Sequence, residues 1–149
     1  MSRHILSKKD YKNFMEILQK FNIDGSVMDN IEVETVKKSE IYYFSTKPIF
    51  YKGIPTLYLI NYLKIKNHNI TVDDGAVPHL TNGSNLFAPG IVDIDPDIGD
   101  GDMVFIKNQK GVFIAIGIAN PDIQNIVKNK KGEAVKIIHH LNDNIMNEF

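Results

Sequence analysis

The residues best suited to chemistry in this chain lie between Val72 and Val92, where two tight glycine turns flank one short helix. Asp74 stands before the expected helix and can cap its N-terminus through its carboxylate. Pro78 falls in the first helical turn, where a missing N–H costs little. Gly83 follows the helix and suits the left-handed residue that ends it. This arrangement predicts exposed main-chain N–H groups at a defined edge, which suit a backbone phosphate or a sugar edge.

The stretch and its histidine can also be interpreted as having a purely structural role. Taken without a label, the stretch also fits a strand–helix–strand corner with ordinary turn glycines. His79 sits on the short helix beside the glycine loop, and without a spaced partner it favours capping or packing over metal binding. His139 and His140 are neighbours on a predicted strand, so they point to opposite faces and cannot bind one ion together.

The acidic run from Asp93 to Asp102 resembles a calcium loop in its spacing. Two positions contradict that interpretation, because the sixth residue is Ile98 rather than glycine and the twelfth is Val104 rather than a bidentate glutamate. The run is therefore interpreted as a solvated acidic turn.

Catalytic signatures are missing from the sequence. It contains no cysteine, no Ser/His/Asp triad motif, no Walker loop and no HExxH. We therefore expect no catalytic residues, no metal and no cofactor, and predict that the protein is not an enzyme.

Composition points to a folded protein of one large or two small domains. The chain has 149 residues, of which 43% are hydrophobic and 23% charged. No apolar run approaches a membrane span and the first residues lack the core of a signal peptide, so a soluble cytoplasmic protein is expected. Residues 1–70 carry 11 Lys/Arg and 7 Asp/Glu, whereas residues 71–149 carry 6 and 11. If the protein binds RNA, the first domain should supply much of the phosphate attraction, although a solvated imbalance with no partner is the alternative.

The first 66 residues are expected to form a small α+β domain. A short strand is predicted at 3–6, and Ser7 opens a capping pattern before an amphipathic helix. Strands are predicted at 31–36, 41–45 and 49–51, with a hairpin turn at 37–40. The apolar residues from Pro55 to Leu63 favour a short helix with proline at its first position.

Residues 67–149 are expected to form a mostly β domain. Strands are predicted at 70–72, 86–92, 103–107, 112–118 and 134–141, closed by the last one into a small barrel. Gly117 indicates a bulge or a close backbone approach. A short helix is predicted after Asn120, with Asn120 as its cap and Pro121 at its first position.

The order of these motifs resembles a known domain. The letters DDGAVPHLTNGSNLFAPGI are similar to the first half of a PUA domain (the pseudouridine synthase and archaeosine transglycosylase domain), and Gly101–Val104 and Val112–Ala119 resemble its second half. Pro55–Leu57 and His139–Asp143 resemble segments of the malignant-T-cell-amplified-sequence and translation-machinery-associated family, in its archaeal type with a pre-PUA domain. The resemblance covers residues 55–143 well and residues 1–54 more loosely.

The resemblance implies a non-enzymatic RNA-binding protein of the translation apparatus. It implies structured RNA as the partner, either tRNA or small-subunit ribosomal RNA, in initiation or ribosome recycling, and in eukaryotic members a partner with an SUI1-type domain. The short helix, the glycine loop and the edge of the last strand would form the RNA surface. Carried over by position, the RNA-binding residues are His79, Thr81, Asn82, Gly83, Ser84, Asn85, Phe87, Ala88, Pro89 and Gly90, to which we add Lys128, Lys130 and Lys131 from their charge.

Two other hypotheses remain open. The chain could be a non-catalytic PUA adaptor subunit of an RNA-modification enzyme, and a large exposed patch of Tyr42, Tyr43, Phe50 and Tyr51 would favour such a protein partner. A small-molecule or metal-binding domain would instead require a deep apolar pocket with convergent polar groups, for which the sequence shows no constellation.

Overall fold

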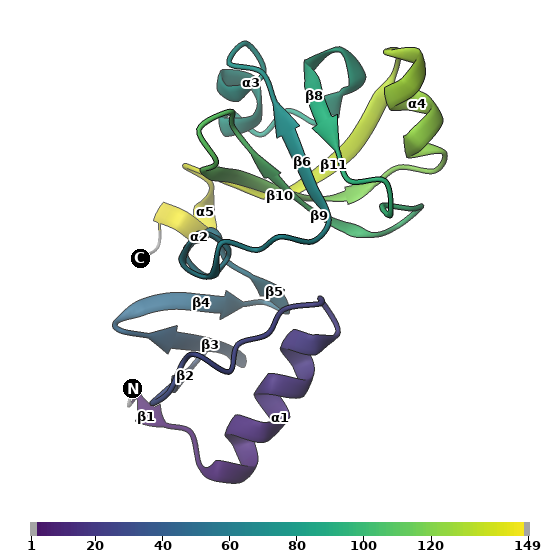
Figure 1. Cartoon of the computed structure of the whole chain (residues 1–149). Helices are drawn as coiled ribbons and strands as arrows, with labels where there is room; N and C mark the ends of the chain where they lie inside the picture. The colour runs from purple at the N-terminus through teal and green to yellow at the C-terminus, as the bar shows by residue number, and fades with distance from the viewer. Residues whose placement is uncertain (1–2, 148–149) are drawn as a thin grey trace. The chain divides into compact units, whose positions relative to one another are not determined.

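The computed structural model describes residues 3–147, which fold into two compact units, with the division in the chain between Lys64 and Ile65 (Figure 1). The first unit is α+β and the second is a mostly β pseudo-barrel, which confirms the predicted fold class. Each unit has its own sheet and its own buried core, so each is described by itself.

The first unit is an antiparallel sheet in the order β1-β2-β3-β4-β5 with two helices. Its elements are β1 (His4–Ile5), α1 (Lys8–Gln19), β2 (Glu32–Val36), β3 (Ser39–Phe44), β4 (Lys47–Tyr51), β5 (Ile54–Pro55) and α2 (Leu57–Leu63).

Helix α1 begins where the capping pattern predicted it, because Ser7 Oγ accepts a hydrogen bond from Asp10 N at 3.1 Å. Its apolar stripe buries Phe14, which stacks on Tyr42 with 4.2 Å between ring centroids. Tyr43, Phe50 and Tyr51 are also buried. Tyr42, Tyr43, Phe50 and Tyr51 therefore pack in or against the core of this unit and do not form the exposed patch that would have favoured an adaptor.

Two of the three hairpins of this unit, β2–β3 and β3–β4, have tight turns made of left-handed residues other than glycine. Lys37 and Lys38 have φ values of 50° and 69°, and Ser45 and Thr46 have 49° and 67°. Two consecutive left-handed residues match the right-handed twist of the strands, so β3 begins at Ser39 and β4 at Lys47, both earlier than predicted.

The position of Pro55 was predicted wrongly. Pro55 lies in β5, and Thr56 is the N-cap of α2, where its Oγ1 donates to Pro48 O at 2.7 Å and accepts from Leu59 N at 3.4 Å. A fully buried threonine that serves both β4 and the helix makes Leu57, two residues after the proline, the first helical residue.

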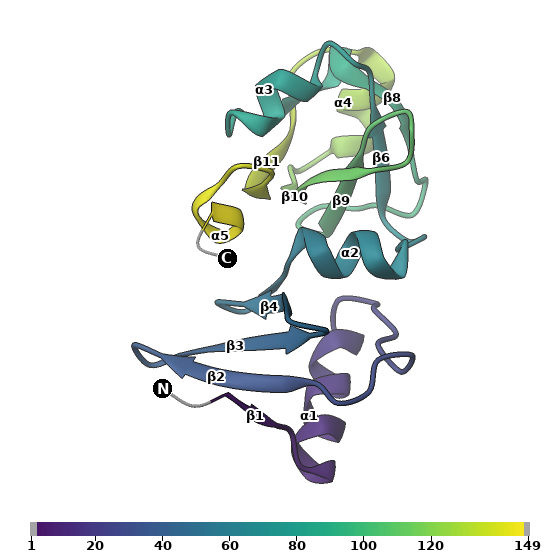
Figure 2. The same ribbon diagram turned by 90° about the vertical axis from the view of Figure 1, so that its left-hand side faces the viewer.

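The second unit is a curled six-stranded sheet in the order β7-β11-β10-β9-β6-β8, seen from two sides in Figures 1 and 2. All pairs are antiparallel except β6–β9, which is parallel. Its elements are β6 (Asn69–Val72), α3 (Val77–Thr81), β7 (Leu86–Phe87), the 3-10 turn η1 (Ala88–Gly90), β8 (Ile91–Ile94), β9 (Met103–Lys107), β10 (Phe113–Ala119), α4 (Ile123–Asn129), β11 (Glu133–His140) and α5 (Asn144–Asn147).

The strand predicted over 86–92 is divided by η1 into β7 and β8, because Pro89 sits inside that turn. The two pieces pair with different strands, β7 with β11 and β8 with β6. The bend at Ala88–Gly90 was expected, but its consequence for pairing was not.

Gly117 lies where the β10–β11 register shifts, which confirms the predicted bulge. A Cβ at this position would lie 2.7 Å from Lys136 O, so the close backbone approach is also confirmed. The helix predicted after Asn120 starts later, with Asp122 as its N-cap. Asn120 does not cap it because its Nδ2 donates to Glu133 O and Oε2 on β11.

Candidate nucleic-acid interface

Helix α3 ends in a Schellman motif built around Gly83. Gly83 has a φ of +90°, Ser84 N donates to His79 O at 3.0 Å, and Gly83 N donates to Leu80 O at 3.0 Å. The predicted left-handed role of Gly83 is confirmed. These bonds consume the N–H groups of residues 83 and 84, and Asn82 N also donates within the helix, so the expected row of exposed N–H groups is absent at this turn.

Helix α3 begins later than predicted, with its N-cap two residues after Asp74. Asp73 Oδ1, not the Asp74 carboxylate, accepts from Ala76 N at 2.9 Å. Ala76 is the N-cap and makes no side-chain bond there. Asp73 is the carboxylate used because its own carbonyl also accepts Ala76 N at 3.2 Å, which closes a turn directly after β6. Pro78 does lie in the first turn of the helix, as predicted.

A pocket of about 510 Å³ lies between α3 and the segment 84–90. Six of the predicted site residues line it: His79, Ser84, Asn85, Phe87, Pro89 and Gly90. Phe87 is 53% exposed, although it is aromatic. The hypothesis of a ligand-binding domain required a deep apolar pocket with convergent polar groups, whereas this hollow is mostly apolar but wide open to solvent.

The remaining residues of the predicted loop have different positions. Asn82 is exposed at the end of α3, and Thr81 is half-buried with its Oγ1 donating to Pro78 O at 3.2 Å. Ala88 is 1% exposed, so its side chain packs in the core and offers no surface for a ligand. Its main chain instead holds the loop against the end of the basic turn, because Ala88 N donates to Gly132 O at 2.8 Å.

Glu133 on β11 holds the pocket segment in place, and sequence reasoning missed it. Its Oε1 accepts from Asn85 Nδ2 at 3.0 Å and its Oε2 from Asn120 Nδ2 at 2.8 Å. The hydrogen bonds from Asn120 and Asn85 lower the pKa of the Glu133 carboxyl below its ordinary value. Asn85 Oδ1 in turn accepts from Ile137 N at 2.9 Å. The side chain of Asn85 thus extends the ladder beyond the short strand β7.

The basic turn lies beside this segment. Lys128, Lys130 and Lys131 are exposed, and Lys130 ends α4 in a left-handed conformation. Gly132, which follows them, accepts the Ala88 hydrogen bond, and Phe87 is paired with Glu133. The structure therefore brings the basic turn next to η1, although about forty residues separate the two in sequence.

His140 reaches the same surface from β11, although the sequence pattern suggested only that it could not share an ion with His139. Its Nδ1 donates to Leu141 O at 2.7 Å, because a carbonyl can only accept. A Cβ built on Gly83 would lie 3.1 Å from His140 Nε2. The imidazole therefore lies against the glycine turn, and a side chain at position 83 would press on the ring in addition to being strained by the positive φ.

His139 points to the opposite face, as strand alternation predicted, and the structure shows that it is fully buried. Its Nδ1 lies 2.6 Å from Asp143 Oδ2, which also accepts from His140 N at 2.9 Å. Burial lowers the pKa of His139 against the opposing effect of Asp143. Burial acts to raise the pKa of Asp143, but hydrogen bonds from His139, His140 N and Met146 N outweigh it and leave that pKa lowered.

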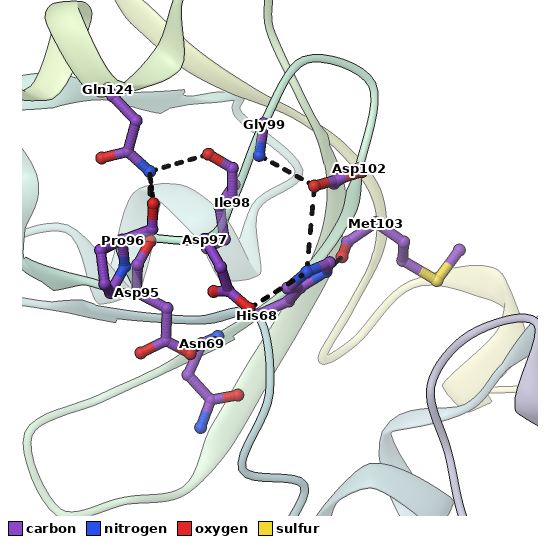
Figure 3. Close-up of polar contacts among 10 residues, drawn as sticks. All are labelled: His68, Asn69, Asp95, Pro96, Asp97, Ile98, Gly99, Asp102, Met103 and Gln124. Atoms are coloured by element: carbon purple, nitrogen blue, oxygen red, sulfur yellow. Dashed lines mark hydrogen bonds and ion pairs between the residues drawn. The ribbon is translucent and has the colours of Figure 1, made fainter.

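The acidic run 93–102 is a structured loop rather than an open cluster of carboxylates (Figure 3). Asp95 Oδ2 accepts from Asn69 N at 2.8 Å, and Asp102 Oδ2 from Gly99 N at 2.8 Å. Gln124 Nε2 donates to three main-chain carbonyls of the loop, and His68 Nε2 lies 3.8 Å from Asp97 and 3.9 Å from Asp102. Within residues 3–147, no group of three or more His, Asp or Glu side chains is placed to hold a metal ion.

No helix in the described part of the chain is both long and apolar enough to cross a membrane.

Comparison with known proteins agrees with the two-unit division. Residues 68–141 match the PUA domain family, and residues 2–63 match a family described as a domain of unknown function (DUF1947). An uncharacterized protein of Methanocaldococcus jannaschii is 36% identical over 97% of this chain and 95% of its own length. Translation machinery-associated protein 20 of Saccharomyces cerevisiae is 27% identical over 84% of this chain and 77% of its own length.

A solved structure has the same fold along the whole chain. The conserved PUA domain protein from Thermoplasma acidophilum is 41% identical and superposes with a TM-score of 0.90, covering 99% of both chains. Together, these matches show that the chain belongs to the PUA-domain proteins with a DUF1947 pre-PUA region before the PUA domain, a group whose relatives include the translation machinery-associated protein.

Proposed function

We propose that this protein binds structured RNA of the translation apparatus, either tRNA or small-subunit ribosomal RNA, in initiation or ribosome recycling, and that it acts by binding rather than by catalysis. The PUA domain implies RNA binding, and the similarity to a translation machinery-associated protein supports the role in translation. The observation that carries the proposal is the pocket beside α3, which has an exposed aromatic ring on one wall and a basic turn next to it.

Each part of this surface suits a different part of an RNA. The ring of Phe87 can stack on an unpaired base, and such stacking is worth about 1–3 kcal/mol per base. His79 and Ser84 line the same pocket with polar groups that can bond a base edge or a 2′-hydroxyl. Lys128, Lys130 and Lys131 would attract phosphates. The acidic loop 93–102 would repel RNA, so RNA should approach from the α3 side.

The proposed RNA surface includes every residue carried over from the family resemblance, but Ala88 supports the surface and does not contact RNA. It consists of His79, Thr81, Asn82, Gly83, Ser84, Asn85, Phe87, Pro89, Gly90, Lys128, Lys130 and Lys131, with Ala88 as a buried support.

The first experiment measures binding of tRNA and of small ribosomal subunits across a salt series. One variant changes Lys128, Lys130 and Lys131 to Glu, and a matched variant changes Lys8, Lys9 and Lys12 to Glu. We expect steep salt dependence in the unmodified protein and a flatter slope in the first variant, because each lost phosphate contact lowers the slope by about one counterion. A flatter slope only in the second variant would move the phosphate contacts to the first unit. Absence of binding at moderate salt would overturn the proposal.

A second experiment tests the pocket itself. An RNA hairpin with an unpaired overhang should bind more tightly than the blunt hairpin, and Phe87→Ala should remove that difference, weakening the overhang complex by about tenfold or more. Val112→Ala is a matched control, since Val112 is an exposed apolar residue outside the pocket. Equal binding of both hairpins would contradict the stacking role.

A further inference from the structure

Strand β1 is an edge strand of the sheet in the first unit, and it carries an exposed apolar residue. Leu6 N donates to Ile31 O at 2.9 Å, and His4 and Ile5 pair with Val33 and Glu32 in the same register. Hydrogen-bonded pairs alternate along antiparallel strands, so the main-chain N–H and C=O of Ile5 point away from β2. Among the described residues no strand pairs with that side of β1. The side chain of Ile5 is 59% exposed.

A groove of about 380 Å³ runs beside this edge. Its apolar lining comes from Ile5, Leu6, Tyr11 and Ile31. The Tyr11 hydroxyl donates to Met28 O at 2.5 Å, so the ring that forms one wall is already fixed in place. A free edge next to a preformed apolar groove matches the two requirements for adding a strand, which are main-chain partners and a pocket for alternate side chains.

Positive charge beside the groove favours a negatively charged partner. Lys8 lines the groove, and Lys12 lies one turn further along the same face of α1. Both are exposed, and among residues 3–147 no ion pair involves a lysine. The N-terminal end of the twelve-residue helix α1 adds positive potential at the same place. Free lysines at that end are locally unfavourable to the helix and favour a negatively charged occupant.

We propose that an extended acidic segment of a partner protein adds to β1 as a further strand, with apolar side chains in the groove and carboxylates on Lys8 and Lys12. RNA is the less suitable occupant, because it has no peptide N–H and C=O groups to continue the ladder at the free edge of β1. Asp29 also lines the groove, so the carboxylates of the segment are placed at Lys8 and Lys12 and not along the whole lining. A second copy of this chain is also less suitable, since antiparallel β1 edges would bring two sets of these lysines together. The surface is separate from the pocket proposed for RNA, so either site can be tested without the other.

The experiment is a titration of the full chain with a short peptide that alternates valine and glutamate, followed by amide NMR signals and by peptide anisotropy. A peptide in which lysine replaces glutamate is the charge control. We expect the acidic peptide to shift the Ile5 and Leu6 signals and to bind at least about tenfold more tightly than the basic one.

Two variants distinguish strand addition from other modes. Ile5→Pro removes the outward N–H while leaving the Leu6–Ile31 bond to β2, and it should abolish binding, whereas Ile5→Val should retain it. Lys8→Glu with Lys12→Glu should weaken the acidic peptide about tenfold or more, whereas Lys37→Glu with Lys38→Glu, at a distant turn, should not. This charge pair keeps the test decisive if the proline variant fails to fold.

Four results would overturn the proposal. They are absence of binding by the acidic peptide, equal binding of both peptides, a shift of the Ile5 and Leu6 signals by an RNA hairpin but not by the peptide, and a concentration-dependent dimer that accounts for those shifts.

Discussion

Asn85 and Glu133 lie 48 positions apart in sequence, and the Asn85 Nδ2 donates to Glu133 Oε1 at 3.0 Å. The other end of the same amide accepts from Ile137 N at 2.9 Å. One side chain therefore uses its donor and its acceptor to attach the pocket segment to β11. The two-residue strand β7 would otherwise hold that segment with few main-chain bonds.

We predict that Asn85→Ala lowers the stability of the second unit by about 1–3 kcal/mol, because it leaves Ile137 N without its partner. Asn82→Ala is the control, since Asn82 is exposed and its main-chain N–H, which alanine keeps, donates to the carbonyls of Pro78 and His79. Urea unfolding followed by signals of the second unit measures the difference. Equal stability of the two variants would show that the amide does not hold the segment.

The stability of the second unit should fall as pH drops below the ordinary His value of 6.5. Burial lowers the folded-state pKa of His139, so the unfolded chain takes up a proton before the folded one does. The stabilisation is complete above pH 6.5 and is lost towards the lower folded-state pKa. His139→Gln should flatten this part of the profile, whereas His79→Gln on the exposed face of α3 should not. A profile unchanged by His139→Gln would assign the effect to another group.

The hairpin between β2 and β3 should tolerate better turn residues. Lys37→Asn with Lys38→Gly should raise the free energy of unfolding of the first unit by about 1 kcal/mol, because both positions have positive φ. Replacing both lysines with alanine removes the same charges without relieving the backbone and should give no such gain. Thermal unfolding of the three proteins makes the comparison, and a gain from the alanine pair would attribute the effect to charge.

Gly117→Ala should destabilise the second unit by about 1–3 kcal/mol, because the new methyl group would meet Val135 and the main-chain oxygen of Lys136. Gly75→Ala is the control, since its nearest atom would be Asp73 Oδ1 at 3.5 Å, an ordinary contact. Denaturant unfolding of both variants tests this. Comparable effects at the two glycines would mean that β11 moves away from β10 at little cost.

Features that depend on a few neighbouring residues were predictable from the sequence. Ser7 caps α1, Gly83 ends α3 and Gly117 marks the bulge, each because the local backbone geometry accepts few other residues. The fold class followed from strand patterns and from the order of the motifs. These predictions needed no information about distant parts of the chain.

The errors arose where a distant residue determines a local choice. Asn120 had the right type for a helix cap, but Glu133 takes its amide. One error was local instead: the loop N–H groups looked available for phosphate, but the Schellman motif bonds them to carbonyls of the preceding helical turn. Neither the pairing of Asn85 with Glu133 nor the position of His140 over Gly83 has a signal in sequence spacing. The RNA-binding role of the loop residues 79–90 and of the basic turn stays a prediction.

The topology of the second unit has a consequence for synthesis on the ribosome. In the first unit every strand pairs with its neighbour in sequence, so this unit can fold as soon as it emerges. In the second unit β11 supplies the pairing for both β7 and β10. Until residues 133–140 leave the ribosome, the nascent chain carries strands with unsatisfied edges. That interval is when chaperones would have most to protect.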